Sequence, residues 1–444
     1  MVEAGRAGES LDELMDALAC CFGRVEPRRQ ARKYIACLMS GVPRKNCWTL
    51  AQEAGDRTPD RMQRLLERAS WDHKSAMGVV ARFVAGRLGS GDAVAVIDES
   101  GQLKKGKCTA GVKRQYVGCA GRVENAVNVV YCSYGVPAGH ALAAARLYLP
   151  AEWAGDLPRR RAAGVPDDIT FQTKPQLAIE MLTALAGQGI CPPWAAADEV
   201  YGNDPKLRAF LEQAGTGYVL GIRCSFAITL PSGRKIRADA AARMVPARAW
   251  MTASCGRGSK GDRDYAWAWL ATASPRHTLL VRRNLRDPSA DLAFFYCYVP
   301  PGRPACFTTL IRVAGRRWPV EEDFQVGKGH FGLADSQVRT YTALCRHLAL
   351  SMAALAVCAV TAADARPRAA ALPAPPKGPD DQPPEDPGLI PLTVAEVRRL
   401  HDLLTRTCQT IRHHLHWSWW RRRHQARARW FHQRTRLRRQ AAEP

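Results

Sequence analysis

Two aspartates in this sequence each follow a short apolar run. Asp98 comes directly after residues 93–97, and Asp198 comes directly after residues 194–197. Short apolar runs bounded by turn residues are typical of buried strands, so we expect each carboxylate to stand where a strand ends. Carboxylates at the ends of neighbouring strands can together hold a divalent cation. Taken alone, Asp98 could equally be an ordinary turn aspartate beside a solvated basic loop.

A third carboxylate, Glu321, has basic residues on both sides. Pro319, with acidic residues just after it, predicts the start of a helix. Arg317, Glu321 and Lys328 follow one another at separations of four and seven residues, which places them near one face of that helix. We interpret this stripe as a metal-binding glutamate flanked by phosphate contacts. A ladder of salt bridges along the helix is the alternative.

Basic residues outnumber acidic ones in the chain as a whole. Lys and Arg number 64 against 41 Asp and Glu, a formal net charge of +23, so the expected partner is a polyanion, with nucleic acid ahead of membrane lipid. Two basic clusters are candidate DNA contacts, one close behind Asp98 and one near the C-terminus. Their members are Lys104, Lys105, Arg421, Arg422 and Arg423. A solvated basic tail is the alternative for the second cluster.

The apolar periodicity predicts an α/β protein with several regions. An all-α region comes first, and strands followed by strand–helix alternation then predict a mixed sheet with flanking helices. A β-rich insertion interrupts this core, and a Pro-rich linker precedes a basic helical tail. In chain order the regions are 1–90 (helical, DNA-binding), 91–222 with 305–362 (core), 223–304 (insertion), 363–391 (flexible linker) and 392–444 (tail).

Two tryptophans in the insertion, Trp267 and Trp269, are separated by the period of a strand and follow basic residues. Alternate aromatic residues on one face of a strand are more often core than a platform for nucleic acid. Stacking of an unpaired base on them is nevertheless physically possible. We therefore keep both tryptophans as candidate DNA contacts.

Several classes of protein are disfavoured. No apolar stretch is expected to reach the roughly 18–20 residues of a membrane span, since residues 348–363 are fewer and follow Arg346 and His347. The N-terminus has no signal-peptide pattern. The 15 cysteines contain no Cys-x-x-Cys pair, which indicates reduced thiols in a cytoplasmic protein. The sequence has no phosphate-binding loop that would imply ATP.

Several motifs carry a family resemblance across nearly the whole chain. They are residues 26–28, 44–48, 97–101, 104–106 and 114–116, Asp198 with Tyr201 and Gly202, and residues 318–324 with Lys328. By these motifs the chain resembles the DDE transposases of bacterial insertion sequences, which have a ribonuclease-H-like catalytic core. The resemblance implies that Asp98, Asp198 and Glu321 are the catalytic, metal-binding D, D and E. Arg317 and Lys328 match the basic residues of the signature around the glutamate, whereas its usual tyrosine is replaced by Ala314.

The resemblance implies a transposase, an endonuclease that cleaves DNA and transfers its strands. Three carboxylates would hold two Mg²⁺ or Mn²⁺ ions, one activating the nucleophile and one stabilising the leaving oxygen. The implied partners are the inverted-repeat ends and the target DNA, with a homodimer in the synaptic complex and a nucleoid-associated, cytoplasmic location. The resemblance also implies that an aromatic residue of the insertion receives a flipped base. Two alternatives stay open: a silent or domesticated DNA-binding protein descended from a transposase, and a ribonuclease-H-like nuclease of other purpose.

Overall fold

The computed structural model describes residues 2–89, 91–258, 261–287, 292–304, 306–366, 378, 380–382, 384–385, 389–406 and 408–441. A single ten-stranded mixed sheet organises these residues, in the order β2-β3-β1-β5-β6-β12-β11-β10-β9, with β4 pairing to β3. Its strands are β1 (Val94–Leu103), β2 (Lys113–Val117), β3 (Arg122–Val136), β4 (Gly139–Leu147), β5 (Trp194–Ala197), β6 (Gly217–Ile222), β9 (Met251–Gly258), β10 (Gly261–Ala271), β11 (His277–Arg283) and β12 (Ala293–Tyr298). A separate hairpin joins β7 (Ala227–Thr229) to β8 (Lys235–Arg237).

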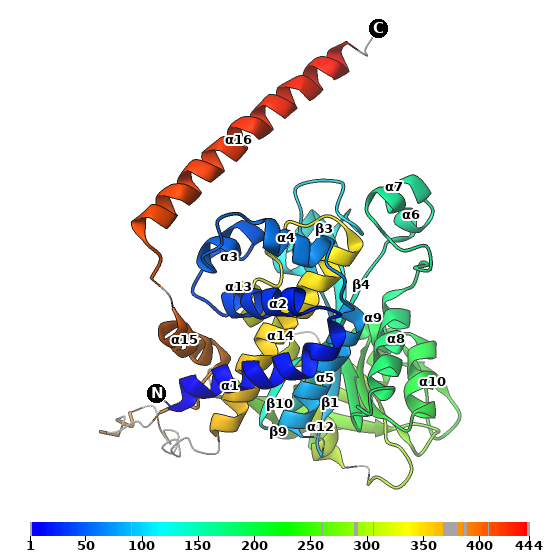
Figure 1. Cartoon of the computed structure of the whole chain (residues 1–444). Coiled ribbons are helices and arrows are strands. Elements are labelled where there is room, and N and C mark those ends of the chain that lie inside the picture. The colour runs from blue at the N-terminus through cyan, green and yellow to red at the C-terminus, as the bar shows by residue number, and fades with distance from the viewer. Residues whose placement is uncertain are drawn as a thin grey trace.

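The helices precede, flank and follow this sheet (Figure 1). The N-terminal set is α1 (Val2–Ala17), α2 (Val25–Leu38), α3 (Cys47–Glu53), α4 (Asp60–Glu67) and α5 (His73–Leu88). Between the strands lie α6 (Ala151–Ala154), α7 (Leu157–Ala162), α8 (Lys174–Ala186), α9 (Glu199–Gly202), α10 (Pro205–Gln213) and α11 (Ala238–Arg243). The chain continues with α12 (Phe307–Gly315), α13 (Trp318–His330), α14 (Tyr341–Ala365), α15 (Val394–Thr405) and α16 (Ile411–Gln440).

The central part of the sheet has the predicted ribonuclease-H-like arrangement. Strands β4, β3 and β1 are antiparallel neighbours, whereas β1, β5 and β6 run parallel. Parallel neighbours need crossover connections, and the helical segments between β4 and β5 and between β5 and β6 provide them. The expected fold class, a mixed sheet with flanking helices behind an all-α region, is confirmed.

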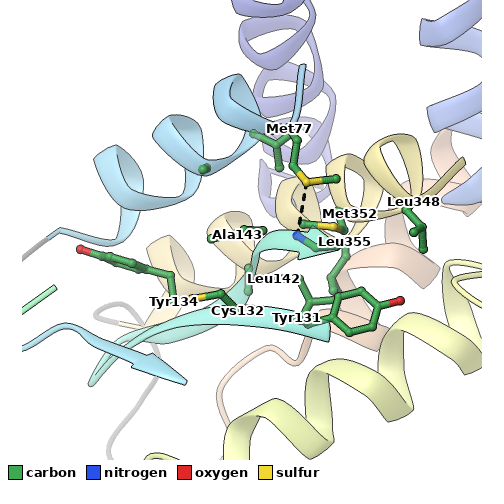
Figure 2. Close-up of a cluster of buried hydrophobic side chains, with 14 of the residues drawn as sticks. Met77, Tyr131, Cys132, Tyr134, Leu142, Ala143, Leu348, Met352 and Leu355 are labelled. Carbon is green, nitrogen blue, oxygen red and sulfur yellow. Dashed lines mark hydrogen bonds between the residues drawn. The ribbon is translucent and has the colours of Figure 1, made fainter. Parts of the chain in front are cut away.

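Helix α14 joins the N-terminal helices to the sheet. It packs against β4 and also against α1, α2, α4 and α5, so one hydrophobic core serves both regions. Figure 2 shows this core, where side chains of α14 meet those of β3 and β4. Met77 of α5 lies there too, and its sulfur accepts a hydrogen bond from the backbone N–H of Ala145 at 3.3 Å. Helices α1, α2, α4 and α5 are therefore built into the same body as the sheet.

Helix α14 is longer than the sequence analysis expected. By length and composition it is the one helix in the described part of the chain that could cross a membrane, with 25 residues and a mean hydropathy of 1.9. Within its most apolar window 94% of the residues are buried in the protein, which covers the apolar surface. The sequence analysis counted the apolar stretch only from residue 348, after Arg346 and His347. That length was too short because both residues lie inside the helix. The guanidinium of Arg346 donates hydrogen bonds to the carbonyl oxygens of Leu66 and Trp71, at 3.1 and 2.9 Å.

The β-rich insertion extends the main sheet. Strand β12 pairs with β6, and β11, β10 and β9 follow outward from it. Trp267 of β10 is fully buried, and its indole N–H donates to the carbonyl oxygen of Ala253 at 3.1 Å. The expectation that Trp267 contacts DNA is therefore wrong, because its ring belongs to the shared core. Trp269 is 45% exposed, with its ring 5.3 Å from that of Phe307.

Replacing Trp267 by Ala should lower the free energy of unfolding by about 3–5 kcal/mol, because it removes a fully buried indole and leaves a cavity. Trp269→Ala is the matched variant, and it should cost far less because that ring is half exposed. Urea denaturation measures both. Equal stability of the Trp267→Ala variant and the wild type would contradict the assigned burial.

In the C-terminal segment, α15 and the start of α16 pack against the rest of the protein, whereas the end of α16 does not. Helix α15 packs against α1 and α14, and the distal part of α16 projects away from the body (Figure 1). Near the start of α16, Trp417 is fully buried and its indole N–H donates to the carbonyl oxygen of Asp56 at 2.9 Å. The predicted linker 363–391 lies mostly outside the described residues, and α14 ends at Ala365, three residues into that predicted linker.

Candidate active site

Asp98 and Asp198 lie side by side in the sheet. Strands β1 and β5 are parallel, and their last paired residues are Ile97 and Ala197, so both aspartates follow at the same level. Asp98 is buried, with 8% of its surface exposed. Asp198 is the N-cap of α9 and accepts a hydrogen bond from the backbone N–H of Val200 at 2.9 Å. The structure thus brings together the two carboxylates that the apolar runs singled out.

The strand boundary at Asp98 differs from the prediction. Strand β1 continues to Leu103 by pairing with β3, so Asp98 lies in the middle of a strand. Only the pairing with β5 stops at Ile97. The Ser100–Gly101 pair suggested a turn, but the long antiparallel partner β3 supplies hydrogen bonds on the other edge and carries the strand onward. Asp198 does follow the end of its strand, as predicted.

Both carboxyl groups are shifted toward the protonated form. Burial raises the pKa of Asp98 to about 7, a rise that the Arg317 guanidinium opposes and the carboxylate of Asp198 reinforces. The pKa of Asp198 is also raised, first by burial and then by the carboxylate of Glu99. A cation placed between these groups would favour their ionised forms. Raised carboxyl pKa values of this kind are characteristic of functional sites.

Helix α13 lies against β1 and presents the basic residues of the predicted stripe. Arg317, at the N-cap of α13, places Nη2 3.6 Å from Oδ2 of Asp98. Lys328, at the other end of the helix, donates from Nζ to the carbonyl oxygen of Gly101 at 3.0 Å. Both ends of the stripe therefore reach β1.

Glu321 lies on α13 between Arg317 and Lys328, and its side chain is exposed. Among the described residues no three His, Cys, Asp or Glu side chains lie close enough together to hold a metal ion. The structure therefore unites Asp98, Asp198 and Arg317, but it does not bring Glu321 into a three-carboxylate cluster.

A buried polar network holds the middle of α13. Asp323 is 2% exposed, accepts a hydrogen bond from the Ser133 hydroxyl, and lies 2.9 Å from Nδ1 of His140. The other ring nitrogen of His140 is 3.3 Å from a carboxylate oxygen of Glu322. Burial alone would lower the pKa of His140, but Asp323 and then Glu322 raise it to about 9. The imidazolium therefore ties β4 to the helix that carries Arg317 and Glu321.

The ion pair between His140 and Asp323 should make the stability of the fold decrease at alkaline pH. Because the pKa of His140 is raised above its ordinary value of 6.5, its contribution is complete below about pH 6.5 and is lost as pH rises through about 9. The melting temperature of the wild type should therefore drop more between pH 7 and pH 10 than that of His140→Gln, which cannot titrate. The exposed His432→Gln is the control. Parallel pH profiles of wild type and His140→Gln would contradict the assignment.

The predicted DNA contacts occupy different environments. Lys104 donates from Nζ to the carbonyl oxygen of Ser336 at 2.8 Å, and burial lowers its pKa to about 8. Its ammonium is engaged within the protein, whereas Lys105 is exposed. Arg421 donates to the side-chain oxygen of Gln52 at 2.6 Å. The remaining two, Arg422 and Arg423, are exposed on α16, and the guanidinium of Arg423 lies 5.2 Å from the ring of Trp419.

Sequence reasoning missed two groups of residues around this site. One is the His140 network, which had no signal in the sequence because a lone histidine in a strand is common. The other is Glu99 with Tyr201 and Lys174. Glu99 and Tyr201 stood inside the family motifs, and their positions next to the aspartates were the available signal.

Comparisons with known proteins identify the family of the chain. The model of the DDE superfamily endonuclease family matches residues 17–262, more than half of the chain, and includes Asp98 and Asp198 but not Glu321. A probable transposase for insertion sequence element IS701 of Microchaete diplosiphon is 27% identical over 197 residues, which are 44% of this chain and 49% of that protein. The chain thus matches about half the length of that relative.

A cryo-EM structure of a piggyBac transposase synaptic complex with hairpin DNA aligns with a TM-score of 0.46 and 11% identity. The alignment covers 86% of this chain and 71% of that one. By the family match over more than half of its residues, the chain belongs to the DDE superfamily endonucleases.

Proposed function

We propose that this protein is an active transposase that catalyses metal-dependent DNA strand cleavage and strand transfer for an insertion sequence. One observation carries the proposal: Asp98 and Asp198 lie at the same level of two adjacent parallel strands, and their pKa values are raised. Two carboxylates held side by side, Asp98 buried and Asp198 half-buried, cost stability unless a cation joins them. A catalytic site offers a reason to retain that arrangement.

The donor set suits a hard cation. Asp98, Asp198 and Glu321 offer only carboxylate oxygens, the ligands that Mg²⁺ and Mn²⁺ prefer. Once bound by these three residues, a pair of such ions would supply the chemistry of in-line displacement at phosphorus. Glu321 lies on α13, which already rests on β1 through Arg317 and Lys328, and it is the carboxylate of the stripe that would complete the set.

The basic residues would bind and orient the DNA. Arg317 already lies beside one carboxylate of the site, where a guanidinium can also contact a phosphate next to the scissile bond. The net charge of +23 and the exposed arginines of α16 favour further contacts along the backbone. We further propose that the protein acts in the cytoplasm, at the nucleoid, as a homodimer that pairs the two inverted-repeat ends with target DNA.

A second candidate function is a catalytically silent or domesticated DNA-binding protein derived from a transposase. The observation that favours it is the exposed position of Glu321, away from any three-residue acidic cluster among the described residues. Such a protein would keep the basic surfaces and bind DNA without cutting it.

The test is an assay of strand cleavage by the purified full-length chain. The substrate is a labelled duplex carrying the terminal sequences that flank the gene, incubated with Mg²⁺ or Mn²⁺ and resolved on a denaturing gel. Cleavage at the element ends that disappears with a chelator supports the transposase. Retarded DNA without any cleaved strand, in either metal, would instead identify the silent DNA-binding protein.

A further inference from the structure

Glu99 connects the two halves of the candidate site. It follows Asp98 in β1, and its side chain is 19% exposed. One carboxylate oxygen accepts a hydrogen bond from the Tyr201 hydroxyl at 2.7 Å, and the other accepts from the ammonium of Lys174. Both oxygens are therefore engaged by groups of the protein itself.

The partners of Glu99 belong to the helix that Asp198 begins and to its neighbour. Tyr201 is fully buried in α9, three residues after the N-cap Asp198. Lys174 is the first residue of α8, and α8 packs against α9. The carboxylate of Glu99 thus binds both α8 and α9 to β1, directly next to Asp98.

Helix α9 has little freedom to sit elsewhere. A Cβ atom added at Gly202, the last residue of α9, would lie 1.9 Å from the carbonyl oxygen of Gly221 in β6. The helix therefore presses directly on the sheet at its C-terminal end, while Glu99 fixes it through Tyr201. Asp198 is the N-cap at the other end of this helix.

The direction of the side chain separates Glu99 from the metal-binding role. Successive residues of a strand point to opposite faces of the sheet, so Glu99 and Asp98 project to different sides. Asp98 meets Arg317 beside α13, whereas Glu99 meets α8 and α9. The carboxylate of Glu99 is nevertheless near enough to Asp198 to affect its charge.

We propose that Glu99 is a positioning residue that sets Asp198 against Asp98 by its hydrogen bond to Tyr201, and that it is not a ligand of the metal. The inference rests on the proposed function, since it concerns how that site is assembled. The ammonium of Lys174 compensates the negative charge of Glu99. This reduces the electrostatic repulsion of placing a third carboxylate near Asp98 and Asp198. Residues that orient ligands in this way commonly change metal affinity or activity by 10–100-fold when replaced.

Three variants of the full chain separate positioning from ligation. Glu99→Gln keeps the shape: its amide oxygen can still accept from Lys174, and its amide N–H can donate to the Tyr201 hydroxyl oxygen. Glu99→Ala removes both contacts, and Tyr201→Phe removes a single oxygen atom. The control is Glu152→Ala, an exposed carboxylate paired with Lys113 at 2.5 Å.

Binding of Mn²⁺, followed by electron paramagnetic resonance, is the first readout, and strand cleavage is the second. Glu99→Gln and Glu152→Ala should bind Mn²⁺ like the wild type, whereas Glu99→Ala and Tyr201→Phe should bind it about 10–100-fold more weakly. If Glu99→Ala does not fold, Tyr201→Phe decides the question, because it leaves the packing of the ring intact.

Two results would overturn the inference alone. Loss of Mn²⁺ binding in Glu99→Gln as severe as in Asp98→Asn would make Glu99 a ligand. Normal Mn²⁺ affinity in Tyr201→Phe would show that the hydrogen bond positions nothing. By contrast, a wild-type protein that neither binds Mn²⁺ nor cleaves DNA would refute the proposed function itself, and the inference with it.

Discussion

Replacing Asp98 by Asn, Asp198 by Asn or Glu321 by Gln should each reduce Mg²⁺-dependent strand cleavage by several orders of magnitude and leave DNA affinity nearly unchanged. Each change removes one ligand charge and preserves the shape of the side chain, so metal binding fails while the basic surfaces remain. Cleavage on a denaturing gel and affinity by fluorescence anisotropy measure the two effects separately.

The three variants also test the outlying position of Glu321. Asp98 and Asp198 already lie together, whereas the proposed function requires Glu321 to join them when metal and DNA are bound. The exposed Asp168→Asn is the matched control and should cleave normally. Near-normal cleavage by Glu321→Gln, with both aspartate variants inactive, would exclude Glu321 from the site and leave its third ligand to be found elsewhere.

Truncating the chain after Gln425 should weaken binding to DNA of any sequence and make that binding much less sensitive to salt. The deletion removes six arginines of the projecting part of α16, which are Arg427, Arg429, Arg434, Arg436, Arg438 and Arg439. Each phosphate contact adds about 0.9 to the slope of log affinity against log salt concentration, so the slope should decrease by up to about 5.

The position of the cut follows from the structure. Trp417 is buried beneath the N-terminal helices, and the ring of Trp420 lies 4.9 Å from that of Trp48, so an earlier cut would expose the core. A full-length variant with the same six arginines replaced by Gln is the control, because it keeps the helix and removes only the charges. An unchanged slope in both proteins would mean that this part of α16 does not bind DNA.

The sequence by itself determined the fold class and most of the candidate site. The apolar runs before Asp98 and Asp198 identified two neighbouring strands, because a strand buried on both faces needs a continuous apolar stretch. The spacing of Arg317 and Lys328 placed both on one face of a helix, and in the structure both reach β1. These inferences depend on local periodicity, which the sequence contains directly.

The tertiary structure decided what each side chain contacts. Trp267 and Trp269 lie two residues apart in β10, so the strand pattern alone does not distinguish them. Trp267 is fully buried and Trp269 is half exposed, because the core covers only part of β10. Lys104 and Lys105 look alike in sequence, but the ammonium of Lys104 donates to a carbonyl oxygen whereas Lys105 is exposed.

The pairing of Glu99 with Tyr201 joins residues 102 positions apart, and that of His140 with Asp323 joins residues 183 apart. Local patterns carry no information on such pairs, since the contact exists only after β1, β4, α9 and α13 are placed around the sheet. The sequence therefore determined which residues could perform the chemistry, and long-range packing decided which of them are held together and which face solvent.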